Sequence, residues 1–162
     1  MKVDYQKLHE RAIQLLSERG VELDDIADIT YQLQTQYYDD LTREECIESV
    51  RVVVGKREVI NTILTGISLD MLTEQGHVEE PLRSLLKNDY SLYGIDEVLA
   101  YSIVNIYGSI GLTNFGYVDK IKLGIIGEID RQGKDSDRCN TFLDDIVGAI
   151  AAAAASRIAH TR

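Results

Sequence analysis

The segment that decides the fold is TFLDDIVGAIAAAAASRIA, residues 141–159. Thr141 is placed to cap a helix, and two acids, Asp144 and Asp145, precede a run of small apolar residues. Gly148 and the alanines let neighbouring helices approach closely, so we expect this helix to be central. Its acids are then expected to face inward.

The rest of the chain is also dominated by helix signals. Pro81 is the only proline, and no long alternation of apolar and polar residues predicts strands. The sequence predicts helices over about 4–20, 24–38, 42–66, 69–74, 82–86, 93–107 and 115–129, followed by a polar loop over 131–140. A capping box of Thr42 and Glu45 opens the third of these, and Gly55 inside it predicts a close helix contact or a bend. We therefore predict an all-α fold, a compact orthogonal bundle of about six to eight helices around the Ala-rich helix, in one domain over residues 1–162.

The overall charge excludes several classes of partner. The 162 residues carry a formal net charge of -10, which argues against nucleic acid and against an anionic bilayer surface. An acidic protein can still bind a phosphorylated ligand where a metal cation supplies the positive charge.

The cysteines and the hydropathy indicate the compartment. Cys46 and Cys139 form no CxxC pair and lie far apart, so we expect two free thiols. The N-terminus lacks the apolar run of a signal peptide. The longest nearly apolar run, residues 146–155, is about half of what is needed to cross a bilayer. We expect a cytoplasmic protein without a transmembrane segment.

Two pairs of acids lie at the beginning of apolar helices. Asp96 and Glu97 open one of them, and one of the two should point inward because neighbouring residues on a helix project about 100° apart. Asp144 and Asp145 open the Ala-rich helix. A buried carboxylate must be paired, protonated or metal-bound. The alternative is that these acids lie in solvated first turns, with Asp144 acting as a capping-box acid.

Two further clusters carry weaker signals. Asp119 and Lys122 are three residues apart and share a helix face, which is also typical of a surface ion pair. Glu45 and Glu48, within Glu44–Glu48, share a face too, and helical nucleotide pyrophosphohydrolases hold magnesium with such pairs. The alternative there is a capped and solvated first turn. The three histidines show no metal-binding spacing, and no P-loop, GxGxxG or GxSxG motif occurs.

The order of these clusters resembles the phosphatidylglycerophosphatase A family. That family shows an I-D-E-V segment, a later F-D-x-x-K-P segment and a final L-D-D-x-x-A-G segment. The corresponding segments of this chain are IDEV at 95–98, FGYVDKIK at 115–122 and FLDDIVGA at 142–149. The match covers the C-terminal half well and the N-terminal half poorly. The whole chain looks like the short, soluble branch of the family from Gram-positive bacteria.

The resemblance implies a magnesium-dependent phosphomonoester hydrolase that converts phosphatidylglycerophosphate to phosphatidylglycerol in phospholipid metabolism. Carried over by position, the metal ligands are Asp96, Glu97, Asp119, Asp144 and Asp145, and the catalytic residues are Asp119 and Lys122. The expected cofactor is Mg²⁺, with Mn²⁺ or another divalent cation as the alternative, because carboxylate oxygens suit hard cations. Lys122 is expected to offset charge on the phosphoryl oxygens.

Two departures keep other functions open. Leu123 stands where the family has proline, and the well-known members are membrane proteins. The substrate is accordingly expected to be a phospholipid head group or a phosphorylated small molecule. The second hypothesis is a non-catalytic metal-binding or regulatory protein that keeps the fold, and the third is the nucleotide pyrophosphohydrolase. The nine tyrosines favour a homo-oligomer, a dimer or a tetramer.

Overall fold

The computed structural model describes residues 3–162, which form helices and contain no strand. The all-α class is confirmed. The helices are α1 (Tyr5–Glu18), α2 (Leu23–Gln34), α3 (Arg43–Val54), α4 (Arg57–Glu74), α5 (Leu82–Lys87), α6 (Ile95–Val104), the 3-10 turn η1 (Asn105–Tyr107), α7 (Gly108–Ile121), α8 (Ile125–Asp135) and α9 (Leu143–Thr161).

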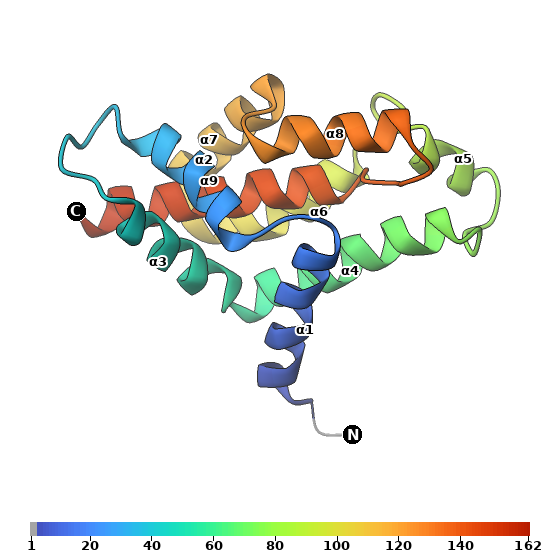
Figure 1. Ribbon diagram of the computed structural model, residues 1–162, viewed down its shortest axis with the longest axis horizontal. Helices are drawn as coiled ribbons and strands as arrows, with labels where there is room; N and C mark the ends of the chain where they lie inside the picture. The colour runs from blue at the N-terminus through green and yellow to red at the C-terminus, as the bar shows by residue number, and fades with distance from the viewer. Residues whose placement is uncertain (1–2) are drawn as a thin grey trace.

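Helix α9 is the central element, as its composition predicts. Its residues from Leu143 to Ser156 are all buried, and it packs against α2, α3, α4, α6, α7 and α8. Figure 1 shows α9 running through the middle of the molecule, with α7 and α8 along one side and α3 and α4 along the other. One close approach requires glycine. A Cβ on Gly66 of α4 would lie 3.1 Å from the Cβ of Phe142 and closer still to the side chain of Ile146.

The long helix expected over 42–66 is divided. Helix α3 ends at Val54 with Gly55 as its C-cap, and Lys56 takes an extended backbone before α4 begins. Gly55 therefore marks a bend between two helices. Helix α4 then continues to Glu74 and includes the segment 69–74 that was expected as a separate helix, because Ile67, Asp70 and Thr73 continue its buried side.

The helix expected over 115–129 is divided as well. Helix α7 begins earlier, at Gly108, and ends where Lys122 adopts the left-handed conformation, with φ 49°. Helix α8 then extends to Asp135 and takes up the first part of the expected polar loop. A left-handed backbone strains a residue with a side chain, so contacts elsewhere in the fold must hold Lys122 in place.

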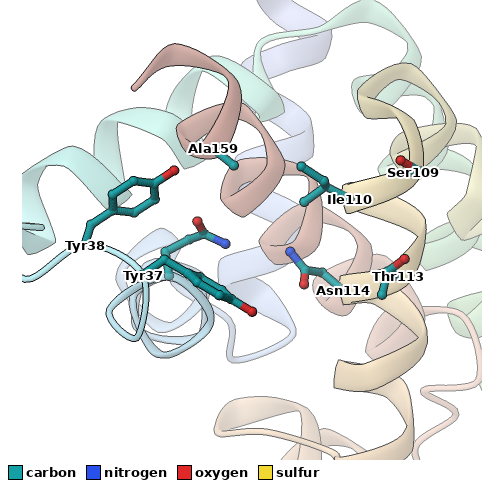
Figure 2. A pocket seen from close by; sticks show the side chains of 8 residues that line it. Tyr37, Tyr38, Ser109, Ile110, Thr113, Asn114 and Ala159 are labelled. Carbon is teal, nitrogen blue, oxygen red and sulfur yellow. The ribbon is translucent and has the colours of Figure 1, made fainter.

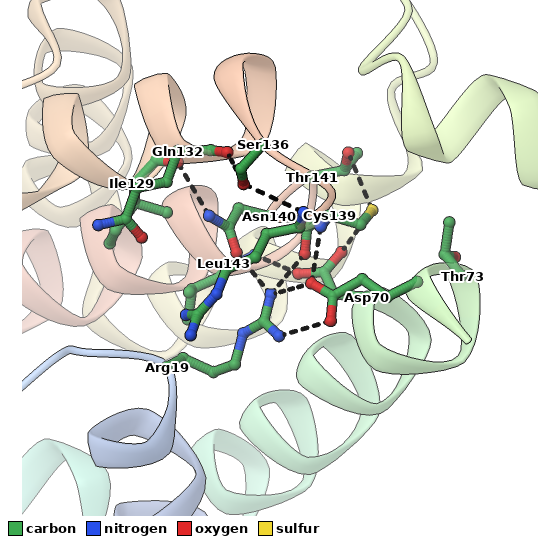
Figure 3. A network of polar contacts seen from close by, with 12 residues as sticks. Arg19, Asp70, Thr73, Ile129, Gln132, Ser136, Cys139, Asn140, Thr141 and Leu143 are labelled. Carbon is green, nitrogen blue, oxygen red and sulfur yellow. Dashed lines mark hydrogen bonds and ion pairs between the residues drawn. The ribbon is translucent and has the colours of Figure 1, made fainter. Parts of the chain in front are cut away.

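The expected Thr141 cap of α9 is wrong. The Thr141 hydroxyl donates to the Leu86 carbonyl oxygen at 2.6 Å and takes no part in capping. Asp70 of α4 caps α9 instead, because its carboxylate accepts the backbone N–H groups of Phe142, at 3.1 Å, and of Leu143, at 3.0 Å. Figure 3 shows this carboxylate beneath the 139–143 segment, with Arg19 beside it.

A partly buried ion pair from the first half of the chain supports the same segment. Arg19 binds Glu74, donates to the Cys139 carbonyl oxygen at 2.8 Å and donates to the Asn140 side chain at 2.7 Å. Glu74 in turn accepts the backbone N–H of Cys139 at 2.7 Å. Helices α1 and α4 together therefore fix the chain immediately before α9.

Two other expectations concern the cysteines and the membrane. Cys46 and Cys139 are both buried free thiols. Within residues 3–162, the structure contains no helix with the length and apolar character that a bilayer-spanning segment needs.

Candidate metal centre

A cavity of about 370 Å³ lies where the 89–94 loop and the start of α6 meet the end of α7 and the start of α9. Its lining includes all the residues that the sequence singled out for metal binding or catalysis, namely Asp96, Glu97, Asp119, Lys122, Asp144 and Asp145. The fold thus brings together side chains from three helices, α6, the end of α7 and α9, over about 50 residues of sequence.

Burial separates the two acids of α6 but not the two acids of α9. Asp96 is 8% exposed and Glu97 is exposed at the rim, so one acid of α6 points inward, as expected. Asp144 and Asp145 are 7% and 5% exposed, so neither lies in a solvated first turn. The capping-box interpretation of Asp144 is wrong, since its oxygens accept from the Asp145 backbone N–H and from Lys122.

Lys122 is the cation around which part of this cluster is organised. Its Nζ donates to Asp119 Oδ1 at 2.8 Å and to Asp144 Oδ2 at 2.9 Å. Although partial burial acts in the opposite direction, the two carboxylates raise the pKa of Lys122 well above its usual range. These two ion pairs link the end of α7 to the start of α9 and hold Lys122 in its left-handed conformation.

The buried carboxylates are only partly compensated. Burial, followed by the negative charges of Asp144, Asp119 and Asp96, raises the pKa of Asp145 to about 9. Burial raises the pKa of Asp144 to about 6 although Lys122 favours its ionised form. The buried Oδ1 of Asp96 has no hydrogen-bond partner among residues 3–162. The cavity therefore holds more carboxyl groups than its lysines could neutralise if all of them were ionised.

These observations fit a divalent cation. The donors are hard carboxylate oxygens, which Mg²⁺ and Mn²⁺ prefer, and one buried oxygen is left without a partner. In the part of the chain that the structure describes, however, no three acidic, histidine or cysteine side chains are already arranged to hold a metal ion. Because Lys122 Nζ lies between Asp119 and Asp144, a cation bound by both acids would require this lysine to move.

Three further charged residues line the cavity without having been predicted: Asp89, Lys120 and Lys134. Asp89 adopts the left-handed conformation in the loop before α6, with φ 45°. The sequence did contain a signal for Asp89, since it is an acid in a polar turn seven residues before Asp96. A loop that folds back there returns Asp89 to the start of α6. Lys134 is held by Asp130 at 2.7 Å.

The acidic cluster at the start of α3 has a different environment. Glu45 completes the capping box with Thr42, as expected, and also accepts Arg162 at 2.7 Å. Glu44 and Glu48 are exposed. Glu45 thus has an ordinary structural role, and none of the three histidines lines the carboxylate cavity.

Comparison with known proteins gives one family. The family model described as "Phosphatidylglycerophosphatase A" matches residues 16–160. The chain is 55% identical over 156 residues to "Uncharacterized protein YutG" of Bacillus subtilis, covering 96% of this chain and 93% of that protein. It is 56% identical over 147 residues to "Uncharacterized protein YpjQ" of the same organism, covering 91% of this chain and 81% of that protein.

Solved structures agree with this assignment. The low temperature requirement C protein from Listeria monocytogenes has a TM-score of 0.92 and 52% identity, with 95% of this chain and 96% of that chain covered. A protein of unknown function from Bacillus stearothermophilus has a TM-score of 0.91 and 57% identity, with 94% of each chain covered. The chain therefore belongs to the phosphatidylglycerophosphatase A family, in its Gram-positive branch.

Proposed function

We propose that this protein is a magnesium-dependent phosphomonoester hydrolase whose substrate is phosphatidylglycerophosphate or a closely related phosphorylated head group. The observation that carries the proposal is the single cavity in which Asp96, Asp144 and Asp145 are buried beside Asp119 and Lys122. Membership of the family supports the reaction class.

The residues divide into two roles. Asp96, Asp144 and Asp145, with Asp119 and Glu97 at the opening, would hold the cation. When bound, Mg²⁺ supplies positive charge at the phosphate and lowers the pKa of a coordinated water.

The lysines supply the second role. Lys120, Lys122 and Lys134 line the same cavity and offset negative charge on phosphoryl oxygens. Lys122 is placed to exchange a carboxylate partner for a phosphate oxygen, because its Nζ is already at the centre of the cluster.

An apolar edge beside the cavity supports a lipid head group. Leu92 lines the cavity and is 99% exposed, while Ile95 and Val98, three residues apart on α6, are 54% and 59% exposed. Exposed apolar side chains grouped in this way are typical of a binding surface. They provide a contact for the glycerol and the first carbons of an acyl chain.

The test is release of inorganic phosphate from phosphatidylglycerophosphate in detergent micelles, compared with release from glycerol 3-phosphate, with Mg²⁺ or with EDTA. We expect release only with the metal, and its loss in Asp145→Asn and Asp96→Asn. Asp24→Asn is the matched control, since Asp24 is an exposed acid in the first turn of α2. Full activity in both site variants would exclude the assignment of these residues.

A second candidate is a non-catalytic protein that keeps the fold. The observation in its favour is that Lys122 already pairs with Asp119 and Asp144, so the cluster is partly neutralised without a metal. Leu123, where the family has proline, also favours it. Titration calorimetry with Mg²⁺ or Mn²⁺ separates the hydrolase, which requires heat of binding, from a regulatory protein that binds no metal. The phosphate-release assay separates the hydrolase from a protein that binds metal without catalysis.

We also propose that the protein forms a homo-oligomer, a dimer or a tetramer. Tyr101, Tyr117 and Ile121 of α6 and α7 are 44%, 55% and 42% exposed, and tyrosine is enriched at interfaces. Sedimentation equilibrium should give the mass of a dimer or a tetramer, and a monomer at all concentrations would contradict this part.

A further inference from the structure

A second cavity, of about 570 Å³, lies between the end of α2, the first half of α7 and the end of α9. Gln34, Tyr37, Tyr38, Ser109, Ile110, Thr113, Asn114 and Ala159 line it. Figure 2 shows Tyr37 and Tyr38 on one side and Ile110, Thr113 and Asn114 of α7 on the other. No charged side chain of the described chain is among these lining residues, although the whole sequence is 27% charged.

Two amide side chains in this cavity have unmet hydrogen-bonding capacity. Gln34 is 2% exposed, and its Oε1 lacks a partner within residues 3–162. Asn114 Nδ2 is likewise buried and lacks a partner in the described residues. Native proteins rarely leave buried polar atoms unpaired, and such cases usually have a functional reason.

The geometry allows both amides to serve a ligand. The last torsion of an Asn or Gln side chain is broad and roughly two-fold, so rotation about it can turn either amide atom toward the cavity. Each amide then offers one donor group and one acceptor, from two different helices, to the same space.

This cavity is separate from the carboxylate site. Asp144 and Ala159 lie fifteen residues apart on α9, which corresponds to about 22 Å along the helix axis. A ligand bound here therefore would not occupy the phosphate site.

The chemistry of the lining selects the ligand. No cationic side chain of residues 3–162 lines the cavity, and Arg162, whose guanidinium lies over the Tyr38 ring, is paired with Asp40 and Glu45. A phosphate or carboxylate charge in the cavity would therefore lack an available partner. An acyl chain would leave both amides unpaired. The ring of Tyr37, which is 68% exposed, offers a flat surface for stacking. Amides pair with the edges of nucleobases, and aromatic rings stack on their faces.

We propose that this cavity binds an uncharged nucleobase or nucleoside, with its edge hydrogen-bonded by Gln34 and Asn114 and its face against Tyr37.

The test measures binding and stability in the same variants. Chemical-shift perturbation is recorded with adenosine, guanosine, cytidine and uridine, each raised to about 5 mM, which detects weak millimolar binding. We expect at least one nucleoside to shift resonances of residues 34–38 and 109–114, and its 5′-monophosphate to bind no more tightly. Gln34→Met should weaken binding at least tenfold.

The same variant separates a binding role from a structural one. Because Gln34→Met removes an unpaired buried amide at similar volume, it should raise the Tm by about 2 to 4 °C. A lower Tm would show that Gln34 supports the fold and would overturn the proposal. Gln36→Met is the matched control, because Gln36 is exposed and bonds the Leu33 carbonyl. The proposal also fails if no nucleoside binds, if a monophosphate binds more tightly, or if Gln34→Met binds as well as the native protein.

Discussion

Replacement of Asp70 by alanine should destabilise the protein strongly, although Asp70 lies outside both cavities. The fully buried carboxylate accepts backbone N–H groups of Phe142 and Leu143 at the start of α9 and lies beside Arg19. Losing a helix cap costs about 1 to 2 kcal/mol. Leaving a buried N–H unpaired costs about 1 to 3 kcal/mol more. Burial also raises the pKa of Asp70, so the carboxylate stabilises less than its hydrogen bonds alone suggest.

We therefore expect Asp70→Ala to lower the free energy of unfolding by about 2 to 4 kcal/mol. Asp70→Asn keeps one acceptor oxygen and should lose about half as much. The assay is urea denaturation followed by circular dichroism at pH 7. Asp28→Ala is the matched control, since Asp28 is half exposed and, within residues 3–162, forms an ion pair with Arg43 alone. A loss below about 0.5 kcal/mol for Asp70→Ala, comparable with a surface substitution, would refute the capping role.

Three further outcomes follow from the structure. Burial alone would raise the pKa of Glu74, but Arg19 and the Cys139 N–H outweigh it and lower this pKa. The Arg19–Glu74 ion pair therefore stabilises the fold fully above the usual glutamate pKa. This stabilisation is lost as the pH falls through the lowered pKa. Glu74→Gln should therefore be less stable than the native protein at pH 7, with a difference in denaturation midpoint that narrows between about pH 5 and pH 3. Gly66→Ala should lower the free energy of unfolding, measured by urea denaturation, by about 1 to 3 kcal/mol, because the new Cβ would collide with side chains at the start of α9. Gly116→Ala in α7 should raise it by about 0.5 to 1 kcal/mol, because open space surrounds that position. Lys122→Met should lower the Tm of the metal-free protein, because it removes the positive charge between Asp119 and Asp144. Added Mg²⁺ should restore the Tm, because the cation replaces that charge. A Tm of the variant that does not respond to Mg²⁺ would contradict the metal site.

The helical class and the central helix were predictable because they depend on local composition. The run of small residues in α9 has one arrangement that buries it, which is against several other helices at once. The inward position of Asp96 was predictable for a similar reason, since helical geometry turns one of two adjacent acids toward an apolar core.

The caps and breaks were not predictable, because they depend on contacts distant in sequence. Thr141 obeys the local rule for an N-cap, but Asp70, from another helix, takes that role. The sequence around Lys122 favours a continuous helix. The chain turns there because Asp144, 22 residues later, holds the lysine in a left-handed conformation. Asp89 was missed for the same reason, since only the folded loop brings it to the cavity.

The central claim is that the carboxylates of three helices hold one divalent-metal site. A crystal soaked with Mn²⁺ and measured at the manganese absorption edge tests it most directly. We expect an anomalous peak in the cavity, from an ion bound by Asp96 and by Asp144 or Asp145, with Lys122 moved away from at least one of its carboxylate partners. A cavity without an anomalous peak at saturating Mn²⁺, with Lys122 still bonded to Asp119 and Asp144, would contradict it.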